Sequence, residues 1–388
     1  MNVGGPAHYV SLLGGLLDPL RYDSLIVAGR VGPGEASADG LALSYGARLH
    51  TLDDLGPELR WSADLRSTRK IAGILRRFRP HIVHTHTAKA GFTGRLAASM
   101  LSPRPIIVHT YHGHVLEGYF GRRKSDVYRR LEQAAGRISD ALVGVSQATV
   151  DDLVRLRVAP AAKFHAISLG VDLQPFLRVD AAEGARVRGE LGMTQNDIVV
   201  TVAARLVAIK RIDVALRALA LARSRDARLR LLVVGDGELR QELESLALEL
   251  GISADVHFMG YRFDVPAIAA ATDIAMLTSD SEALGMWLVE AAAVGCPTLA
   301  TNVGGIPDVA RSGGGGVTVP VGDPARLAEE LVALASDRAR REAMGAESRA
   351  HVTRAFSVTR FVDDMDALYR ELLERRAMKT NATMCAGT

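Results

Sequence analysis

The chain has 388 residues, of which 48% are apolar and 23% charged, and its net charge is +3. This globular composition and length predict two domains. The two cysteines, Cys296 and Cys385, lie far apart in the sequence, which argues against a disulfide framework. No run of about 18 apolar residues occurs, so we expect no transmembrane helix. The first residues also lack the basic and then apolar pattern of a signal peptide. We expect a cytoplasmic protein.

The charge is unevenly distributed along the chain. Residues 57–139 contain 16 Lys/Arg and five Asp/Glu, a net charge of +11, so the remainder is net negative. A basic first half indicates an anionic partner, such as phospholipid, a lipid diphosphate or nucleic acid. The alternative is a set of solvated helix faces.

The chain opens on a glycine turn, Gly4-Gly5-Pro6, that leads into an expected helix ending at Leu17. In a doubly wound sheet such a turn follows a strand, and proline favours the first helical turn. Because only three residues precede the turn, we expect that a first, central strand is missing from this sequence and that the natural start lies upstream.

Short β-rich runs then alternate with helical patterns to the end of the chain. The first six predicted strands are Leu25–Ala28, Arg48–Leu52, Ile82–His86, Ile106–Thr110, Ala141–Val145 and Phe164–Ser168. The second six are Ile198–Ala203, Leu231–Val234, Val256–Met259, Ile274–Leu277, Thr298–Ala300 and Val317–Pro320. This rhythm predicts βαβ units and two parallel α/β domains.

The domain boundary is placed after the last strand of the first set. We expect an N-terminal Rossmann-like domain over residues 1–173 and a C-terminal one over residues 174–356. A helix over 357–377 carries apolar residues at helical spacing and is expected to pack back on the first domain, and 378–388 should be a disordered tail.

The strongest chemical signal is the segment Ser279–Pro297. A loop after a predicted strand carries Glu282 and Gly285 and opens a helix, whose free amides form an anion site. Carboxylates suit hydroxyl groups, so Glu282 and Glu290 fit a ligand with both sugars and phosphates. The alternative is a helix with glutamates in its first turns, which favour the macrodipole. A second glycine-rich loop over residues 301–308 strengthens the site.

These motifs resemble glycosyltransferase family 4. Ser-x-x-Glu, the Glu282-x7-Glu290 spacing, Glu-Ala-x-Ala-x-Gly-x-Pro and Val-Gly-Gly-Ile-Pro-Asp are joined by further similar turns: Ile82–Gly91, His109–His114, Gly170–Phe176, Ala204–Lys210, Val234–Gly237 and Phe258–Tyr261. The resemblance covers nearly the whole chain. It implies the GT-B fold, with two Rossmann-like domains facing a cleft, the N-terminal one binding the acceptor and the C-terminal one the nucleotide sugar. It also implies a retaining transferase that needs no metal or other cofactor.

The resemblance also implies residue roles. Glu282 holds hydroxyls of the donor sugar, Glu290 holds the ribose, and Arg205 and Lys210 clamp the diphosphate, where two cations can stabilise the leaving group. The alternative for these cations is a solvated helix start. His112 meets the donor sugar, and Gly4 and Gly5 let backbone approach the phosphates. Further donor-binding residues are Gly260, Tyr261, Ala283, Leu284, Gly285, Met286 and Trp287, and the acceptor-side residues are His86, Lys89 and His114.

Histidines cluster in the first half, at His81, His84, His86, His109, His112 and His114. Such a cluster could hold zinc, but no nearby cysteine or carboxylate pair completes a ligand set. We therefore expect these residues to line a cleft, with one or two contacting substrate.

The acceptor is the least specified part. The expected helix Ala63–Phe78 interleaves Arg and Lys with Leu and Ile, and Leu116–Lys124 sets aromatic residues beside a basic cluster. Both patterns are compatible with peripheral binding to an anionic membrane. Because many relatives build envelope glycans, we expect transfer of a hexose or N-acetylhexosamine to a lipid-linked or growing cell-envelope glycan, with a soluble small acceptor as the alternative.

Three other functions stay open. Nucleotide-sugar 2-epimerases share this architecture, and a degenerate sugar-nucleotide-binding protein would explain a missing strand. Nucleic-acid binding is disfavoured, because the basic half has no recognition-helix or aromatic RNA-binding signature.

Overall fold

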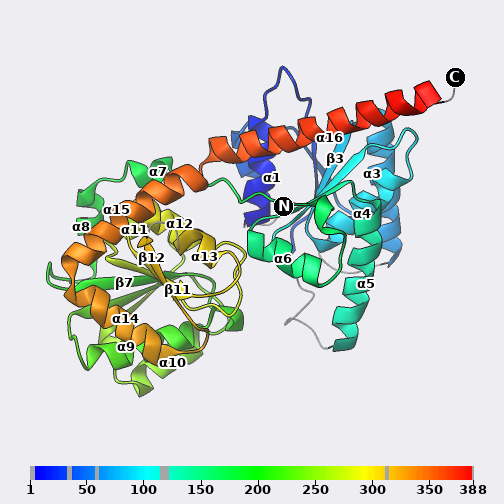
Figure 1. Cartoon of the computed structure of the whole chain (residues 1–388). Helices are drawn as coiled ribbons and strands as arrows, with labels where there is room; N and C mark the ends of the chain where they lie inside the picture. The colour runs from blue at the N-terminus through cyan, green and yellow to red at the C-terminus, as the bar shows by residue number, and fades with distance from the viewer. Residues whose placement is uncertain (1–4, 33–36, 57–60, 114–121, 311–313, 387–388) are drawn as a thin grey trace. The chain divides into compact units, whose positions relative to one another are not determined.

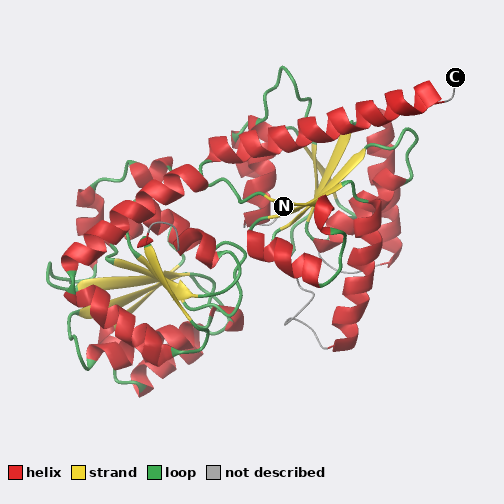
Figure 2. Ribbon diagram, viewed as in Figure 1, coloured by secondary structure: helices red, strands yellow, loops and turns green. Residues whose placement is uncertain are grey.

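The computed structural model describes residues 5–32, 37–56, 61–113, 122–310 and 314–386. The chain forms two compact units, which are described separately below. The first unit comprises Met1–Gly170 with Val358–Thr388, and the second comprises Val171–Ser357. Each is built from parallel strands covered by helices, as Figures 1 and 2 show. The α/β prediction is confirmed.

The second unit contains one six-stranded parallel sheet of order β12-β11-β10-β7-β8-β9. Its strands are β7 (Ile198–Ala203), β8 (Leu229–Val234), β9 (Val256–Gly260), β10 (Ile274–Leu277), β11 (Thr298–Thr301) and β12 (Gly316–Val319). Its helices are α7 (Gln174–Leu177), α8 (Ala181–Glu190), α9 (Ile212–Arg223), α10 (Arg240–Glu249), α11 (Val265–Ala271), α12 (Met286–Ala293), α13 (Ile306–Ala310), α14 (Pro324–Ser336) and α15 (Arg338–Ala355). The chain runs outward from β7 in one direction and from β10 in the other, so the topological switch lies between these two central strands.

The first unit has two parallel sheets where the sequence predicted one set of six strands. β1 (Ile26–Gly29) pairs with β2 (Leu49–Leu52), whereas β3 (Ile82–His86), β4 (Ile106–Tyr111), β5 (Ala141–Gly144) and β6 (Phe164–Ala166) form a four-stranded sheet. Among the described residues no strand joins the two sheets by hydrogen bonds. Side chains from β2, β4 and the helices between them nevertheless share one apolar core.

The helices of the first unit are α1 (Gly5–Leu16), α2 (Asp39–Ser44), α3 (Trp61–Phe78), α4 (Ala88–Ser99), α5 (Arg122–Ile138), α6 (Gln147–Arg155) and α16 (Val358–Ala386). Across both units all twelve predicted strands are present, with ends that differ by at most two residues. Apolar runs bounded by turn residues suffice to locate buried parallel strands.

The last helix, α16, continues through Ala386, where the sequence predicted a disordered tail from Met378. The difference has a local cause, because no glycine or proline interrupts the chain between the start of α16 and Gly387. The apolar side chains of Phe361, Met365 and Leu368 are buried within the first unit. Helix α16 therefore contributes to the core of that unit.

A buried hydrogen-bond chain ties α16 to the sheet and to α1. Met365 Sδ has no proton, so it accepts from the Tyr9 hydroxyl at 3.3 Å. The Tyr9 oxygen then accepts from Thr110 Oγ1 at 3.4 Å, and Thr110 accepts from His84 Nε2 at 2.7 Å. Tyr369 in turn donates to His84 Nδ1. The chain thus runs in one direction and requires a neutral His84, whose pKa burial lowers to about 3.

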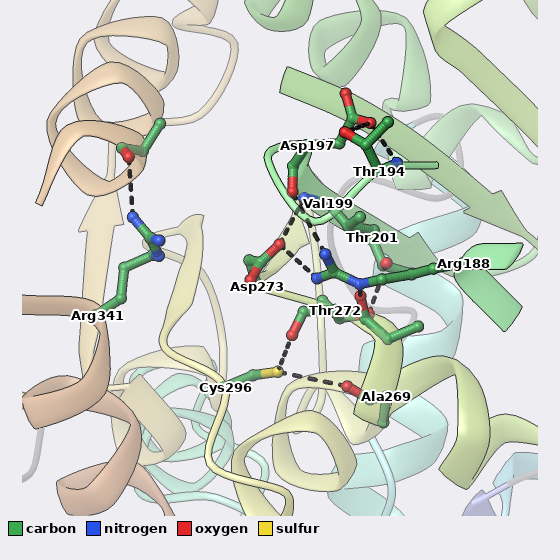
Figure 3. Close-up of polar contacts among 12 residues, drawn as sticks. Arg188, Thr194, Asp197, Val199, Thr201, Ala269, Thr272, Asp273, Cys296 and Arg341 are labelled. Atoms are coloured by element: carbon green, nitrogen blue, oxygen red, sulfur yellow. Dashed lines mark hydrogen bonds and ion pairs between the residues drawn. The ribbon is translucent and has the colours of Figure 1, made fainter. Parts of the chain in front are cut away.

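Charged side chains form a network of hydrogen bonds and ion pairs at the amino-terminal edge of the second unit's sheet, where the strands begin (Figure 3). Arg188 of α8 donates to Asp273 Oδ2 at 2.6 Å and to the Ala271 carbonyl at 2.9 Å. Asp273, just before β10, also accepts from the Val199 amide at 2.8 Å. Asp197, just before β7, pairs with Arg230 Nη2 at 3.0 Å. Every carboxylate named here has a cationic partner, so this edge is satisfied internally.

Candidate active site

The candidate site occupies the opposite, carboxyl-terminal edge of the same sheet. The loop after β7 carries Arg205 and Lys210, and the loop after β10 carries Glu282. Because β7 and β10 are adjacent, their loops meet at the switch point, which is where open α/β sheets bind ligands. Nine of the residues predicted to hold the donor, including Glu290 of α12, lie in the segments that follow these two strands.

Lys210 and Glu282 form an ion pair across the switch point. Lys210 Nζ lies 2.5 Å from Glu282 Oε1, and the side chains are 18% and 12% exposed. Ser279 donates its hydroxyl to the same Oε1 atom at 2.9 Å. Within the part of the chain that the structure describes, both donors therefore use one carboxylate oxygen, and Oε2 can accept from a ligand hydroxyl. The role of Ser279 was missed in the sequence, although its i, i+3 spacing to Glu282 is the signal of such a turn.

Arg205 supplies a second cation on the same loop. Its side chain is exposed, and its carbonyl accepts from the Val207 amide at 3.0 Å, which tightens the loop. A guanidinium presents a planar fork of donors that suits phosphate oxygens. The loop after β7 thus carries two cationic side chains, Arg205 and Lys210, that suit an anionic ligand.

The start of helix α12 offers backbone amides to the same region. Gly285 precedes the helix at φ 80°, a conformation that favours glycine, and no side chain caps the first amides. The side chains of Leu284 and Trp287 are only 4% and 3% exposed, and the Trp287 indole donates to the Thr201 carbonyl at 3.0 Å. These two predicted donor-binding residues therefore face the core, and only their backbone can serve a ligand. Ala283 and Met286 are half-buried.

Glu290 lies one helical turn into α12. Its carboxyl is half-buried, and burial raises its pKa to about 7. No cation accounts for this shift, in contrast to the paired carboxylates at the other edge. A ligand that donates hydrogen bonds to the ionised form would supply the missing stabilisation.

The loops of the site support one another through backbone contacts. A Cβ at Gly304 would lie 1.7 Å from the Glu282 carbonyl oxygen, and one at Gly305 would lie 2.2 Å from that of Ala283. The Gly305 amide donates to the Glu282 carbonyl at 3.2 Å. The second glycine-rich loop therefore packs directly against the backbone of the Glu282 loop and supports it.

The turn after β9 contributes Gly260 and Tyr261. Gly260 adopts φ 64°, and its carbonyl accepts from the Gly235 amide at 2.8 Å. Tyr261 is 70% exposed, so its ring is accessible. An exposed ring at this edge can stack on a planar group.

The predicted residues of the first unit form a separate group. His86 Nδ1 lies 3.1 Å from His112 Nε2, so the two rings share one hydrogen bond. Burial lowers the pKa of His112 to about 3 and that of His86 well below its usual value, so both are neutral at physiological pH. Lys89 Nζ pairs with Asp64 Oδ1 at 2.6 Å, a partner that the sequence analysis did not anticipate. Gly5 begins α1, and Gly4 and His114 lie outside the described residues.

Three apolar residues of the basic helix α3 are in the core, whereas Leu65 is exposed. Ile71, Ile74 and Leu75 are 7–8% exposed and pack in the cluster shared with β2 and β4. The interpretation of this stretch as a membrane-lying amphipathic face is therefore wrong for these three residues. They serve the fold, and the arginines Arg69, Arg76 and Arg77 face solvent.

Within the described ranges, no helix contains an apolar stretch of the length needed to span a bilayer. No three His, Cys, Asp or Glu side chains within those described ranges are grouped to hold a metal ion.

Comparison with known proteins identifies related sequences. Residues 3–175 match the family described as Glycosyltransferase Family 4, and residues 185–351 match Glycosyl transferases group 1. D-inositol 3-phosphate glycosyltransferase from Xylanimonas cellulosilytica is 31% identical over 76% of this chain and 73% of its own. UDP-Gal:α-D-GlcNAc-diphosphoundecaprenol α-1,3-galactosyltransferase from Escherichia coli is 26% identical over 80% of each chain.

A similar fold occurs in a solved structure. The Anabaena protein HepE, in complex with UDP and glucose, superposes with a TM-score of 0.80 and 21% identity over 95% of this chain and 96% of its own. At this identity the likeness concerns the fold, which is GT-B, as predicted.

Proposed function

The chain belongs to glycosyltransferase family 4, a family of retaining enzymes, and we propose that it moves a hexose or N-acetylhexosamine from a nucleoside-diphosphate sugar to an acceptor hydroxyl. The observation that carries this proposal is the Lys210–Glu282 pair, which leaves Glu282 Oε2 without a partner among the described residues, opposite a loop that also carries Arg205. A sugar diphosphate matches that set, because it has hydroxyls to donate and negative charge to be held.

The proposed roles follow the chemistry of each group. Glu282 Oε2 accepts from a hydroxyl of the donor sugar, and Arg205 and Lys210 hold the diphosphate as charge grows on it in the transition state. Lys210 can reach a phosphate oxygen while it keeps its contact with Glu282, because an ammonium has three donors. The amides at the start of α12 add hydrogen bonds to phosphate, and Glu290 accepts from the ribose hydroxyls.

We assign His112 a role at the reacting sugar as a neutral hydrogen-bonding group. The support is its pairing with His86, which occupies Nε2 and leaves Nδ1 for a ligand. A neutral imidazole can donate or accept at that atom without adding charge. His86→Asn and His112→Asn should each lower kcat, and unaltered kcat in both variants would remove the pair from the mechanism.

For the acceptor, we propose a lipid-linked glycan at an anionic membrane. One relative acts on a diphosphoundecaprenol substrate by its name. On α5 the apolar side chains of Val127 and Leu131 are 57% and 42% exposed beside the exposed Arg130, a pattern that suits a membrane surface. The test is flotation with vesicles of anionic phospholipid at low salt. Arg130→Glu should weaken binding, Arg326→Glu on α14 is the control, and no flotation of the native protein would contradict the proposal.

Donor identity can be tested with a thermal-shift panel, starting with UDP-glucose, UDP-galactose and UDP-N-acetylglucosamine. A donor at 100 times its Kd stabilises the folded protein by about 2.7 kcal/mol, which is readily measured. Incubation with donor alone and with donor plus acceptor, followed by sugar analysis, distinguishes a glycosyltransferase from a 2-epimerase. Transfer to an added acceptor supports the proposal, whereas a 2-epimer without acceptor would identify an epimerase. Equal inactivity of the native protein and Glu282→Ala would point to a binding protein.

A further inference from the structure

A buried threonine joins the two loops that face each other at the switch point. Thr278, the first residue after β10, is fully buried. Its hydroxyl donates to the Arg211 carbonyl at 2.8 Å and to the Lys210 carbonyl at 3.1 Å. A hydroxyl has one proton, so this is a shared, three-centre bond from one loop to two consecutive carbonyls of the other. Nothing in the sequence motifs singled Thr278 out.

The turn that receives this bond has an unusual backbone. Arg211 adopts φ 48° and ψ 45°, the left-handed region that residues with a side chain rarely occupy, and it begins α9 without a side-chain cap. Such a conformation persists where neighbouring groups hold it. Two further bonds act at the same place, because the Asp280 amide donates to the Ile209 carbonyl at 2.9 Å and Arg211 Nη1 donates to Asp280 Oδ1 at 3.2 Å.

The turn held in this way is the one from which Lys210 projects. Lys210 ends the short turn Ala208–Lys210, and its ammonium lies 2.5 Å from Glu282, four residues beyond Thr278. We infer that Thr278 is a positioning residue for the diphosphate clamp: its hydroxyl fixes the backbone of Lys210 and Arg211, and so fixes where the Lys210 ammonium lies when a nucleoside diphosphate binds. The inference rests on the proposed function, and it adds a residue that touches no ligand.

The chain offers a matched control. Thr298 lies in β11 of the same sheet, is 1% exposed, and its hydroxyl has no hydrogen-bond partner among the described residues. Thr→Val at either position removes a hydroxyl and keeps the shape of the side chain. Thr278→Val breaks the link between the loops, whereas Thr298→Val breaks no hydrogen bond within the described ranges. Thr278→Ser keeps the hydroxyl and should therefore retain the binding affinity and activity of the native protein.

The test uses the full chain and two probes, UDP and inorganic pyrophosphate, the second of which is independent of the base. Calorimetry at 10 °C measures affinity, and steady-state kinetics with the donor from the panel measures kcat and KM. Thr278→Val should lower the affinity for both probes and the kcat/KM about five- to tenfold, as expected for loss of a hydrogen bond that positions a charge. Thr278→Ser and Thr298→Val should stay within about twofold of the native protein on the same scale.

The outcomes separate this inference from the proposed function. If Thr278→Val binds pyrophosphate and UDP as the native protein does, Thr278 does not position the clamp, and Lys210→Ala still tests the function. Equal losses in Thr278→Val and Thr298→Val would also overturn the inference, because they would indicate a general effect on the sheet. If Thr278→Val does not fold, Thr278→Ala and Thr278→Ser make the same comparison, and equal affinity of those two would contradict it. A native protein that binds neither probe and transfers no sugar would overturn the function itself.

Discussion

The two edges of the second unit's sheet use the same residue types in opposite ways. Where the strands begin, Asp197 and Asp273 each have an arginine partner. Burial alone would raise the pKa of Asp197, but hydrogen bonds from Thr194 and the charges of Arg230 and Arg188 outweigh it and hold that pKa below its usual value. Where the strands end, Glu290 has burial without a cation, and its pKa is raised to about 7.

This difference distinguishes carboxylates that are paired within the fold from a carboxylate that a bound ligand can stabilise. A buried carboxylate with a paired arginine is satisfied in the free protein. A carboxylate that burial alone perturbs is stabilised only when a partner arrives, and perturbed groups of this kind gather at functional sites. Substitutions at the two edges should therefore give opposite results, with stability lost at one and activity at the other.

The largest effect is expected at Glu282. Glu282→Gln keeps the shape of the side chain but removes its charge, and kcat should fall about a thousandfold, as for loss of a transition-state contact. Because Lys210 is then released from its ion pair, UDP should bind as tightly as before or more tightly. Asp273→Asn at the opposite edge is the control and should keep kcat while lowering stability. Full activity of Glu282→Gln would contradict the assignment.

The next effect concerns stability at the other edge. Arg188→Met leaves Asp273 without its cation, and the side chains of the pair are 22% and 25% exposed. Because the pair is only partly screened by water, we expect a loss of about 2–3 kcal/mol in the free energy of unfolding. Urea titration measures it, and kcat per folded molecule should be unchanged. A loss of kcat with intact stability would mean that this edge also serves catalysis.

A smaller effect is predicted for pH. In the role proposed for Glu290, ribose hydroxyls donate to its ionised form. UDP affinity should then fall as pH drops below 7, by up to about tenfold per unit, and level off above pH 8. The raised pKa also means that the folded protein binds this proton more tightly than the unfolded chain. Its contribution to stability therefore decreases as pH rises from 4.5 to 7. Calorimetry at pH 5.5–8.5 measures the affinity, and Glu290→Gln should remove the dependence.

The smallest effect is expected at Tyr261. Its ring is 70% exposed, so stacking on a base retains much contact with water, and Tyr261→Ala should weaken UDP binding about fivefold. Pyrophosphate binding should not change, because that probe has no base. Phe263→Ala, two residues away at a ring that is 99% exposed, is the matched control. Equal effects of the two variants would show that Tyr261 has no specific contact.

The sequence predicted the strands well because burial on both faces of a parallel sheet leaves continuous apolar runs such as Ile198–Ala203. It did not predict the division of the first unit's strands into two sheets, because pairing depends on hydrogen bonds between distant segments. It placed the apolar residues of α3 at a membrane, because the same amphipathic period fits a core face or a lipid face.

At the site, motifs located Lys210 and Glu282 but not their surroundings. The Lys89–Asp64 pair joins residues 25 positions apart, and the inward direction of Trp287 depends on a carbonyl of another strand. Contacts of this kind arise from tertiary structure and leave no periodic trace in the sequence. Thr278 was missed for the same reason.

The glycines beneath the Glu282 loop bear on how this site can change in evolution. No side chain fits at Gly304 or Gly305 without displacing a carbonyl of the Glu282 loop, so we expect these two positions not to tolerate other residues. Ala283 and Met286, in contrast, are half-buried and can vary in size. New sugar specificities should therefore emerge from a library at these two positions, while a library at the glycines should yield mostly inactive variants.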